Sequence, residues 1–210
     1  MANPQVLVPA QLKIIDTVRK VDLIDFRPIV CKILSENSLE PSRIIPSIKN
    51  YKKFLSIGAA FKASIVPNIE EDTVWHTLHL DTDFYQLVSW FLERSPAIRH
   101  FGYIGIRGGN DKTILNHKYD RGRTLIEEYF IRDKNSQATN CIGQCKIGGS
   151  GCDIHIKDGI LPVFLPELSE EKFLTIQNSL MCHRPPQAGF DFDIPFDLEE
   201  VNTPILGLLK

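Results

Sequence analysis

The sequence has no large excess of charge of either sign and no long uninterrupted apolar run. It carries 24 lysines and arginines against 26 aspartates and glutamates, a formal net charge of -2. A surface that binds nucleic-acid phosphates needs a basic excess, so we expect no nucleic acid as a partner. The longest apolar stretch, FLSIGAAFKASIVP, is interrupted by Lys62 and is too short to span a bilayer. We therefore expect no membrane insertion either.

The sequence also lacks a secretory signal and a complete catalytic motif. The opening MANPQVLVPAQLKII has no basic residues ahead of a long apolar run, so a cytoplasmic protein is expected. No Ser-His-Asp triad is evident. The glycine-rich stretch GYIGIRGGND lacks the lysine and the serine or threonine of a phosphate-binding loop. The sequence therefore assigns no catalytic residue and no nucleotide.

Apolar residues recur at helical spacing through most of the chain, which predicts a mainly α fold. The expected helices cover residues 9–22, 25–36, 41–63, 69–94, 112–133 and 166–181. We expect residues 1–133 to form an orthogonal helical bundle. Residues 134–210 are expected to form a Cys/Gly-rich linker and a proline-rich C-terminal segment that wraps the bundle and contains one short helix.

Residues that favour helix starts support these boundaries. Asp25, Asn68, Asn110 or Asp111, and Ser169 each precede a helical pattern and are predicted as N-caps. Prolines and glycines between the fourth and fifth of these helices predict an irregular connection there.

The segment VWHTLHLDTDF concentrates polar side chains on the fourth expected helix. If that helix is continuous, Asp72, His76, His79 and Asp83 lie along one stripe, at i, i+4, i+7 and i+11. Two imidazoles one turn apart, helped by a carboxylate, can hold a divalent ion such as zinc, iron or copper, and His100 is a candidate third ligand. The alternative is a set of hydrogen-bonded packing residues on an amphipathic helix.

The stretches SIVPNIEEDTVWHTLHLDTDFY and RHFGYIGIRGGND resemble the helical domain of the glycine-rich domain-containing protein-like family, found in small bacterial and plant proteins. The resemblance covers approximately residues 12–131. The positions that match the family pattern are Trp75, His76, Asp81, His100 and Arg107.

This chain departs from the family at one histidine. The family has a second histidine where Leu78 stands here, whereas this chain has His79. A shift of one residue turns a side chain by about 100° around a helix, so the resemblance does not carry over a His-x-His ligand pair.

A second group of potential ligands lies in the segment NCIGQCKIGGSGCDIH, which is similar to the glycine- and cysteine-rich tails of bacterial relatives. Cys141, Cys145, Cys152 and His155 form a C-x3-C-x6-C-x2-H pattern. Such a set can hold zinc, copper(I) or an iron-sulfur cluster. The alternative is a mobile loop with reduced thiols or a redox pair.

Three functions follow as hypotheses. The first is a metal-binding helical protein. An extension of this hypothesis adds metal-dependent activity on a peptide or small molecule. The second is a non-enzymatic module that binds a protein or peptide and keeps its histidines buried in hydrogen bonds. The third is a maturation or recognition factor that uses the cysteine-rich tail.

Overall fold

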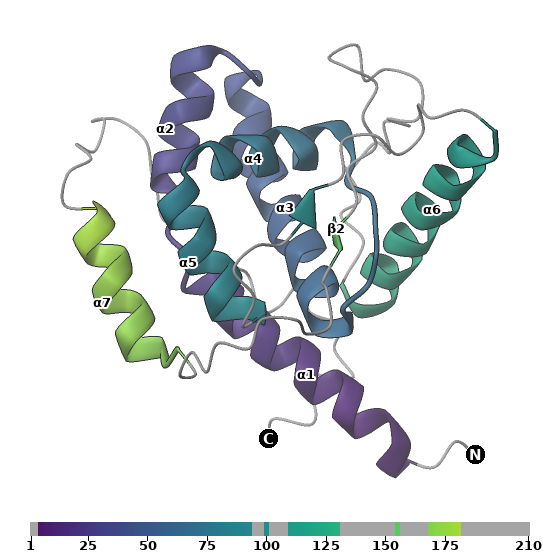
Figure 1. Cartoon of the computed structure of the whole chain (residues 1–210). Coiled ribbons are helices and arrows are strands. Elements are labelled where there is room, and N and C mark those ends of the chain that lie inside the picture. The colour runs from purple at the N-terminus through teal and green to yellow at the C-terminus, as the bar shows by residue number, and fades with distance from the viewer. Residues whose placement is uncertain (1–3, 94–98, 101–108, 131–153, 156–167, 182–210) are drawn as a thin grey trace.

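The fold is mainly α, as the helical periodicity predicts (Figure 1). The computed structural model describes residues 4–93, 99–100, 109–130, 154–155 and 168–181. Its elements are α1 (Pro4–Asp22), α2 (Arg27–Glu36), α3 (Pro41–Phe61), α4 (Ile69–Leu80), α5 (Thr82–Glu93), β1 (Arg99–His100), α6 (Asp111–Tyr129), β2 (Ile154–His155) and α7 (Glu170–Met181). None of the described helices has the length and apolarity needed to cross a bilayer.

Helix α3 is the centre of this arrangement. Every residue from Tyr51 to Ala60 is buried, and α3 packs against α1, α2, α4 and α6 (Figure 1). A continuous run of aromatic contacts, one edge-on and two tilted, leads from the N-cap of α2 through α3 to α4. The ring of Tyr51 lies 6.1 Å from Phe26 and 6.3 Å from Phe54, and Phe54 lies 6.1 Å from Trp75. The buried side of α4 therefore packs on an aromatic core, and the opposite side of the helix is exposed.

The expected single helix over residues 69–94 is wrong, because α4 and α5 are separate helices. Asp81 leaves the helical conformation, with φ -92° and ψ 82°. Its carboxylate accepts a hydrogen bond from the Phe84 amide at 3.3 Å, and its carbonyl accepts one from the Tyr85 amide at 2.8 Å. Asp81 thus caps the start of α5, as aspartate commonly does. The Asp-Thr-Asp sequence is typical of a helix N-terminus, although the apolar residues around it recur at helical spacing.

Helix caps follow the sequence at two of the expected sites. Asn68 and Glu71 form a reciprocal capping box at the start of α4, with both hydrogen bonds at 2.8 Å. Ser169 accepts a hydrogen bond from the Lys172 amide at 3.2 Å at the start of α7. Asn110 is the N-cap of α6 but makes no side-chain cap bond.

The expected cap at Asp25 is displaced by one residue, since the N-cap of α2 is Phe26. The Asp25 carboxylate instead accepts a hydrogen bond from the Arg27 amide at 2.9 Å and pairs with the Arg27 guanidinium. The hydrogen bond from the Arg27 amide closes a local turn, because the aspartate oxygen binds the amide two residues ahead. The same oxygen is then not used to cap the helix.

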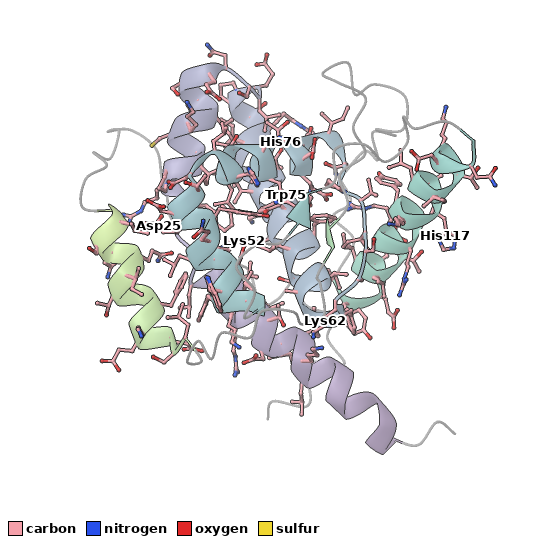
Figure 2. All side chains as sticks on the ribbon, in the orientation of Figure 1. Asp25, Lys52, Lys62, Trp75, His76 and His117 are labelled. Atoms are coloured by element: carbon pink, nitrogen blue, oxygen red, sulfur yellow. The ribbon has the colours of Figure 1, made fainter. Side chains whose placement is uncertain are left out.

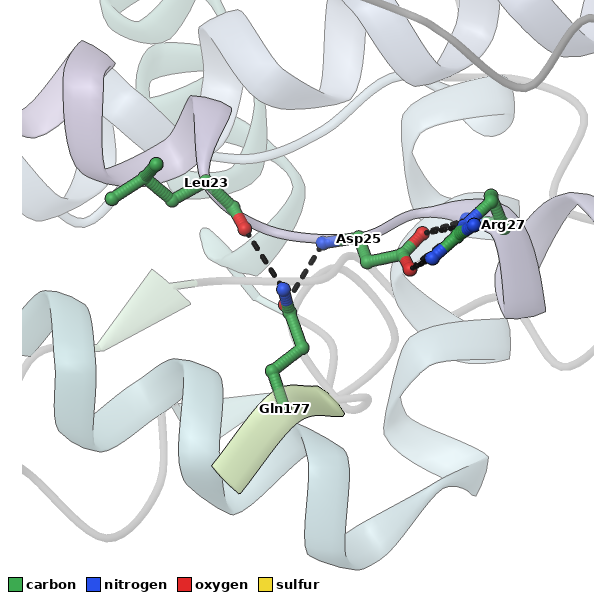
Figure 3. Close-up of polar contacts among 4 residues, drawn as sticks. All are labelled: Leu23, Asp25, Arg27 and Gln177. Atoms are coloured by element: carbon green, nitrogen blue, oxygen red, sulfur yellow. Dashed lines mark hydrogen bonds and ion pairs between the residues drawn. The ribbon is translucent and has the colours of Figure 1, made fainter. Parts of the chain in front are cut away.

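Helix α7 packs against α5 although about 75 residues separate them in sequence. The rings of Phe91 and Phe173 stack with centroids 3.9 Å apart. The Gln177 side-chain amide also hydrogen-bonds to the backbone between α1 and α2. Its oxygen accepts a hydrogen bond from the Asp25 amide at 2.9 Å, and its nitrogen donates one to the Leu23 carbonyl at 3.0 Å (Figure 3). The short helix expected in the C-terminal segment is therefore part of the core.

The connection predicted to be irregular contains β1. This strand pairs antiparallel with β2, so that Arg99 is opposite His155 and His100 is opposite Ile154. The register places His100 beside the segment of the cysteine-rich motif, a proximity that the sequence did not predict.

Candidate functional site

Three consecutive carboxylates at the start of α4 each have a different basic partner. Glu70 binds Arg43 of α3, with nitrogen–oxygen distances of 2.9 and 2.6 Å. Glu71 binds Arg123 of α6, and Asp72 binds His76 of α4 itself. The helix dipole favours acidic residues in a first turn, which the sequence indicated. The partners decide what each carboxylate does.

Glu71 and Arg123 form a buried, two-pronged ion pair between α4 and α6. Both nitrogen–oxygen distances are 2.7 Å, and the Glu71 side chain is only 1% exposed. Burial disfavours the charged guanidinium, but the charge and hydrogen bonds of Glu71 outweigh that effect and raise the pKa of Arg123. One residue away, Gly122 lets α6 approach closely, since a Cβ there would lie 3.1 Å from the Ile65 Cβ.

Asp72 and His76, the latter labelled in Figure 2, form a second pair within α4. The distance from His76 Nε2 to Asp72 Oδ2 is 3.4 Å, and the side chains are 53% and 17% exposed. The hydrogen bond to Asp72 raises the pKa of His76, burial opposes it, and the carboxylate charge adds to the rise. Of the predicted ligands, these two are brought together.

Trp75 and Tyr85 are buried and in contact with each other. The Trp75 ring is fully buried, and its Nε1 donates to the Tyr85 hydroxyl at 3.2 Å. Burial raises the pKa of Tyr85 to about 12, against a smaller lowering by the Trp75 hydrogen bond. His79 is exposed, and its ring centroid lies 4.7 Å from that of Tyr85. His79 therefore packs against the start of α5, close to the Asp72–His76 pair in sequence but with a different neighbour.

The predicted four-residue stripe is broken at its far end. Asp83 belongs to α5, beyond the break at Asp81, and is exposed there. Across the described ranges, no three or more His, Cys, Asp or Glu side chains form a group that could hold a metal ion. Asp72 and His76 thus supply two donors, and a complete site needs further donors from outside the described residues.

The structure does not describe the side chains of several predicted ligands. Cys141, Cys145, Cys152 and Arg107 lie outside the described residues, and His100 and His155 are described in their backbone alone, in β1 and β2. The structure accordingly tests neither the cysteine-rich site nor His100 as a third ligand.

The family-matched residues that are described divide into structural and exposed ones. Trp75 is core and Asp81 caps a helix, whereas His76 is exposed. Leu78, at the position of the family's second histidine, is fully buried in the core. No protein-family model, curated protein or solved structure matches this chain. The resemblance therefore stays a prediction.

Sequence reasoning missed the carboxylate partners and the tyrosines. Glu71 was recognisable as the third residue after Asn68, the position of the acid in a capping box. Arg123 lies 52 residues further on, and no local pattern connects it to Glu71. Tyr51 and Tyr85 fit the pattern of apolar core positions, and nothing in the sequence indicates the partners of their hydroxyl groups.

Proposed function

We propose that this chain is a metal-binding helical protein in which Asp72 and His76 are the first two ligands of a divalent cation. The observation that carries the proposal is their 3.4 Å separation on an exposed helix face. A charge-assisted hydrogen bond between such groups is usually about 2.7–2.9 Å long. Two donors about 2.1 Å from a tetrahedral zinc ion are about 3.4 Å apart. The separation is long for a hydrogen bond and close to the spacing of two ligands on one zinc ion, which supports the proposal.

The anchoring of the pair supports the same proposal. Asp72 follows directly after Glu71, whose ion pair to α6 fixes that turn of the helix, and Trp75 fixes the turn on its inner side. Ligands that their surroundings hold in place lose less conformational freedom when an ion binds. In this proposal His100 is the candidate for a remaining position, because Asp72, His76 and His79 do not form a ligand group among the described residues. Membership of the glycine-rich domain-containing protein-like family stays part of the hypothesis.

A cation held by two or three protein ligands keeps an open position for water or substrate. We therefore extend the proposal to metal-dependent chemistry on a peptide or small molecule. The exposure of His76 supports this extension, because a substrate must reach the ion.

The test is elemental analysis of full-length protein, purified without a histidine tag and dialysed against equimolar zinc. Wild type is expected to retain zinc stoichiometrically, and His76→Ala and Asp72→Asn to lose it. His117→Ala is the matched control, because His117 is an exposed histidine on α6, far from α4 in the sequence (Figure 2). This variant should retain zinc like the wild type.

Two results would redirect the proposal. A folded wild type that binds no metal rejects it and favours the protein- or peptide-binding module. Zinc that is lost only when Cys141, Cys145 and Cys152 are replaced favours the factor that acts through its cysteine-rich tail.

A further inference from the structure

Helix α7 is held on the bundle by two side chains, one apolar and one polar. Of the α7 side chains that the structure describes, only Phe173 and Gln177 are buried, at 0% and 4% exposed. They are four residues apart and therefore lie on one face of the helix. Three more apolar residues pack against the core but stay partly exposed: Leu174, Ile176 and Leu180. The docking of α7 is thus shallow and depends on a Phe-x3-Gln pair.

The apolar member of the pair is bound by α5. The Phe173 ring stacks on Phe91 of α5, with the ring centroids 3.9 Å apart and the planes at 12°. Phe91 is itself only 3% exposed. When an amphipathic helix docks in a groove, a few buried anchors, often aromatic, supply most of the binding free energy. The α5 surface therefore favours an aromatic residue at this position of the docked helix.

The polar member is bound by the backbone of the corner between α1 and α2 (Figure 3). The Leu23 carbonyl accepts a hydrogen bond from Gln177, and the Asp25 amide donates one to it. A primary amide carries its acceptor and its donors on different atoms, so one side chain satisfies both backbone groups. A carboxylate has no proton to donate, and a lysine or arginine has no acceptor. The corner therefore favours a glutamine four residues after the aromatic anchor.

We infer that Phe91 and the backbone of Leu23 and Asp25 form a helix-docking surface for a partner protein, and that α7 occupies this surface in cis. The partner presents an amphipathic helix with Phe and Gln four residues apart, because the surface binds those two side chains. Elements with few buried contacts open locally while the rest of a fold stays intact. Helix α7 has this property, whereas every residue of α3 from Tyr51 to Ala60 is buried. Helix α7 therefore competes with the partner helix.

The first test offers the α7 sequence in trans to the full-length protein. The probe is a fluorescent peptide of residues 168–181, LSEEKFLTIQNSLM, in a buffer that contains EDTA. The full-length Phe173→Ala/Gln177→Ala variant should bind the peptide at least about tenfold more tightly than the wild type, whose tethered α7 competes at high effective concentration. Lys172→Ala/Ser179→Ala changes two exposed residues of α7. This matched control should behave like the wild type.

Altered peptides test the chemistry of recognition. A peptide with Gln177→Glu cannot donate to the Leu23 carbonyl and should bind the double variant about tenfold more weakly, and a peptide with Phe173→Ala should also bind more weakly. A peptide with Lys172→Ala should bind like the original. The inference is overturned if the folded double variant binds no peptide or binds all the peptides equally. If the double variant does not fold, the Gln177→Glu protein keeps the stacked ring and allows the same comparison with the wild type.

The second test measures whether the surface becomes accessible in the wild type. In hydrogen exchange of the full-length protein, the amides of α7 should exchange at least about tenfold faster than those of residues 51–60 in α3. Equal protection of the two helices would mean that α7 leaves only on global unfolding, and this result overturns the inference. The surface uses no residue of α4, and the peptide is bound in EDTA. This proposal and the metal site can therefore fail independently.

Discussion

Glu71 and Asp72 are adjacent acidic residues on one helix turn, and they do opposite things. The Glu71 side chain is 1% exposed and makes two 2.7 Å contacts to an arginine of another helix. The Asp72 side chain is 17% exposed, and its Oδ2 atom lies 3.4 Å from the Nε2 atom of a histidine four residues ahead. About 100° of rotation around the helix axis separates the two carboxylates. That rotation turns Glu71 toward Arg123 of α6 and Asp72 toward His76 of α4 itself.

The difference shows that burial decides which role each of two neighbouring carboxylates can have. A buried carboxylate must keep its partner, because an uncompensated charge in the interior is costly. A partly exposed carboxylate can exchange its partner at little cost, since water replaces part of the lost interaction. Glu71 is therefore suited to holding the fold, and Asp72 to binding something.

The largest expected effect comes from breaking the buried pair. Arg123→Ala leaves the Glu71 charge inside the protein and should lower the free energy of unfolding by about 3–5 kcal/mol. Urea denaturation measures this loss. Arg121→Ala removes an exposed arginine two positions away on α6 and should change the free energy by less than about 0.5 kcal/mol. Equal losses in the two variants would remove the basis for the comparison.

A smaller effect is expected at the cap that holds Glu71 from the other side. Asn68→Ala removes the hydrogen bond to the Glu71 amide and should cost about 1 kcal/mol. Asn110→Ala is the matched change at the N-cap of α6, where the side chain makes no cap bond, and should cost clearly less. Thermal or urea unfolding of both variants decides the point. A larger loss at Asn110 contradicts the cap assignment.

The smallest effect on stability is expected from the outer pair, and its signature is in pH. The pKa of His76 is raised in the folded state, so its interaction with Asp72 is fully present below the unfolded pKa of about 6.5. It is lost as pH rises through the higher folded pKa. Because His76 is 53% exposed, the contribution should stay below about 0.5 kcal/mol.

Asp72→Asn sharpens that expectation. Without the carboxylate, the pKa of His76 should fall toward its ordinary value, as measured by NMR titration of the metal-free imidazole. The exposed His117 serves as the internal reference in the same spectra. A His76 pKa that is the same in wild type and variant would show that the pair does not form in solution.

Local signals predicted most of the helices, and non-local contacts escaped prediction. Apolar periodicity and the caps at Asn68 and Ser169 gave the correct elements, because those signals lie within a few residues of what they determine. The break at Asp81 was missed because its neighbours on both sides keep a helical pattern. The bonds of Gln177 to residues about 150 positions earlier have no local trace, since folding alone brings those segments together.

The candidate site was predictable in part for the same reason. Asp72 and His76 are four residues apart on one helix, so geometry alone places them together. The extended stripe failed because it needed helical geometry to continue to Asp83. The burial that distinguishes Glu71 from Asp72 depends on where α6 packs, which no residue of α4 encodes by itself.

The most direct test of this division of labour is a zinc titration of full-length wild-type protein, followed by NMR of the histidine imidazoles. We expect the His76 signals to shift and saturate at one equivalent of zinc, while the His117 signals stay unchanged and the unfolding temperature of the protein stays the same or rises. Signals of His76 that stay unchanged at several equivalents of zinc would contradict it.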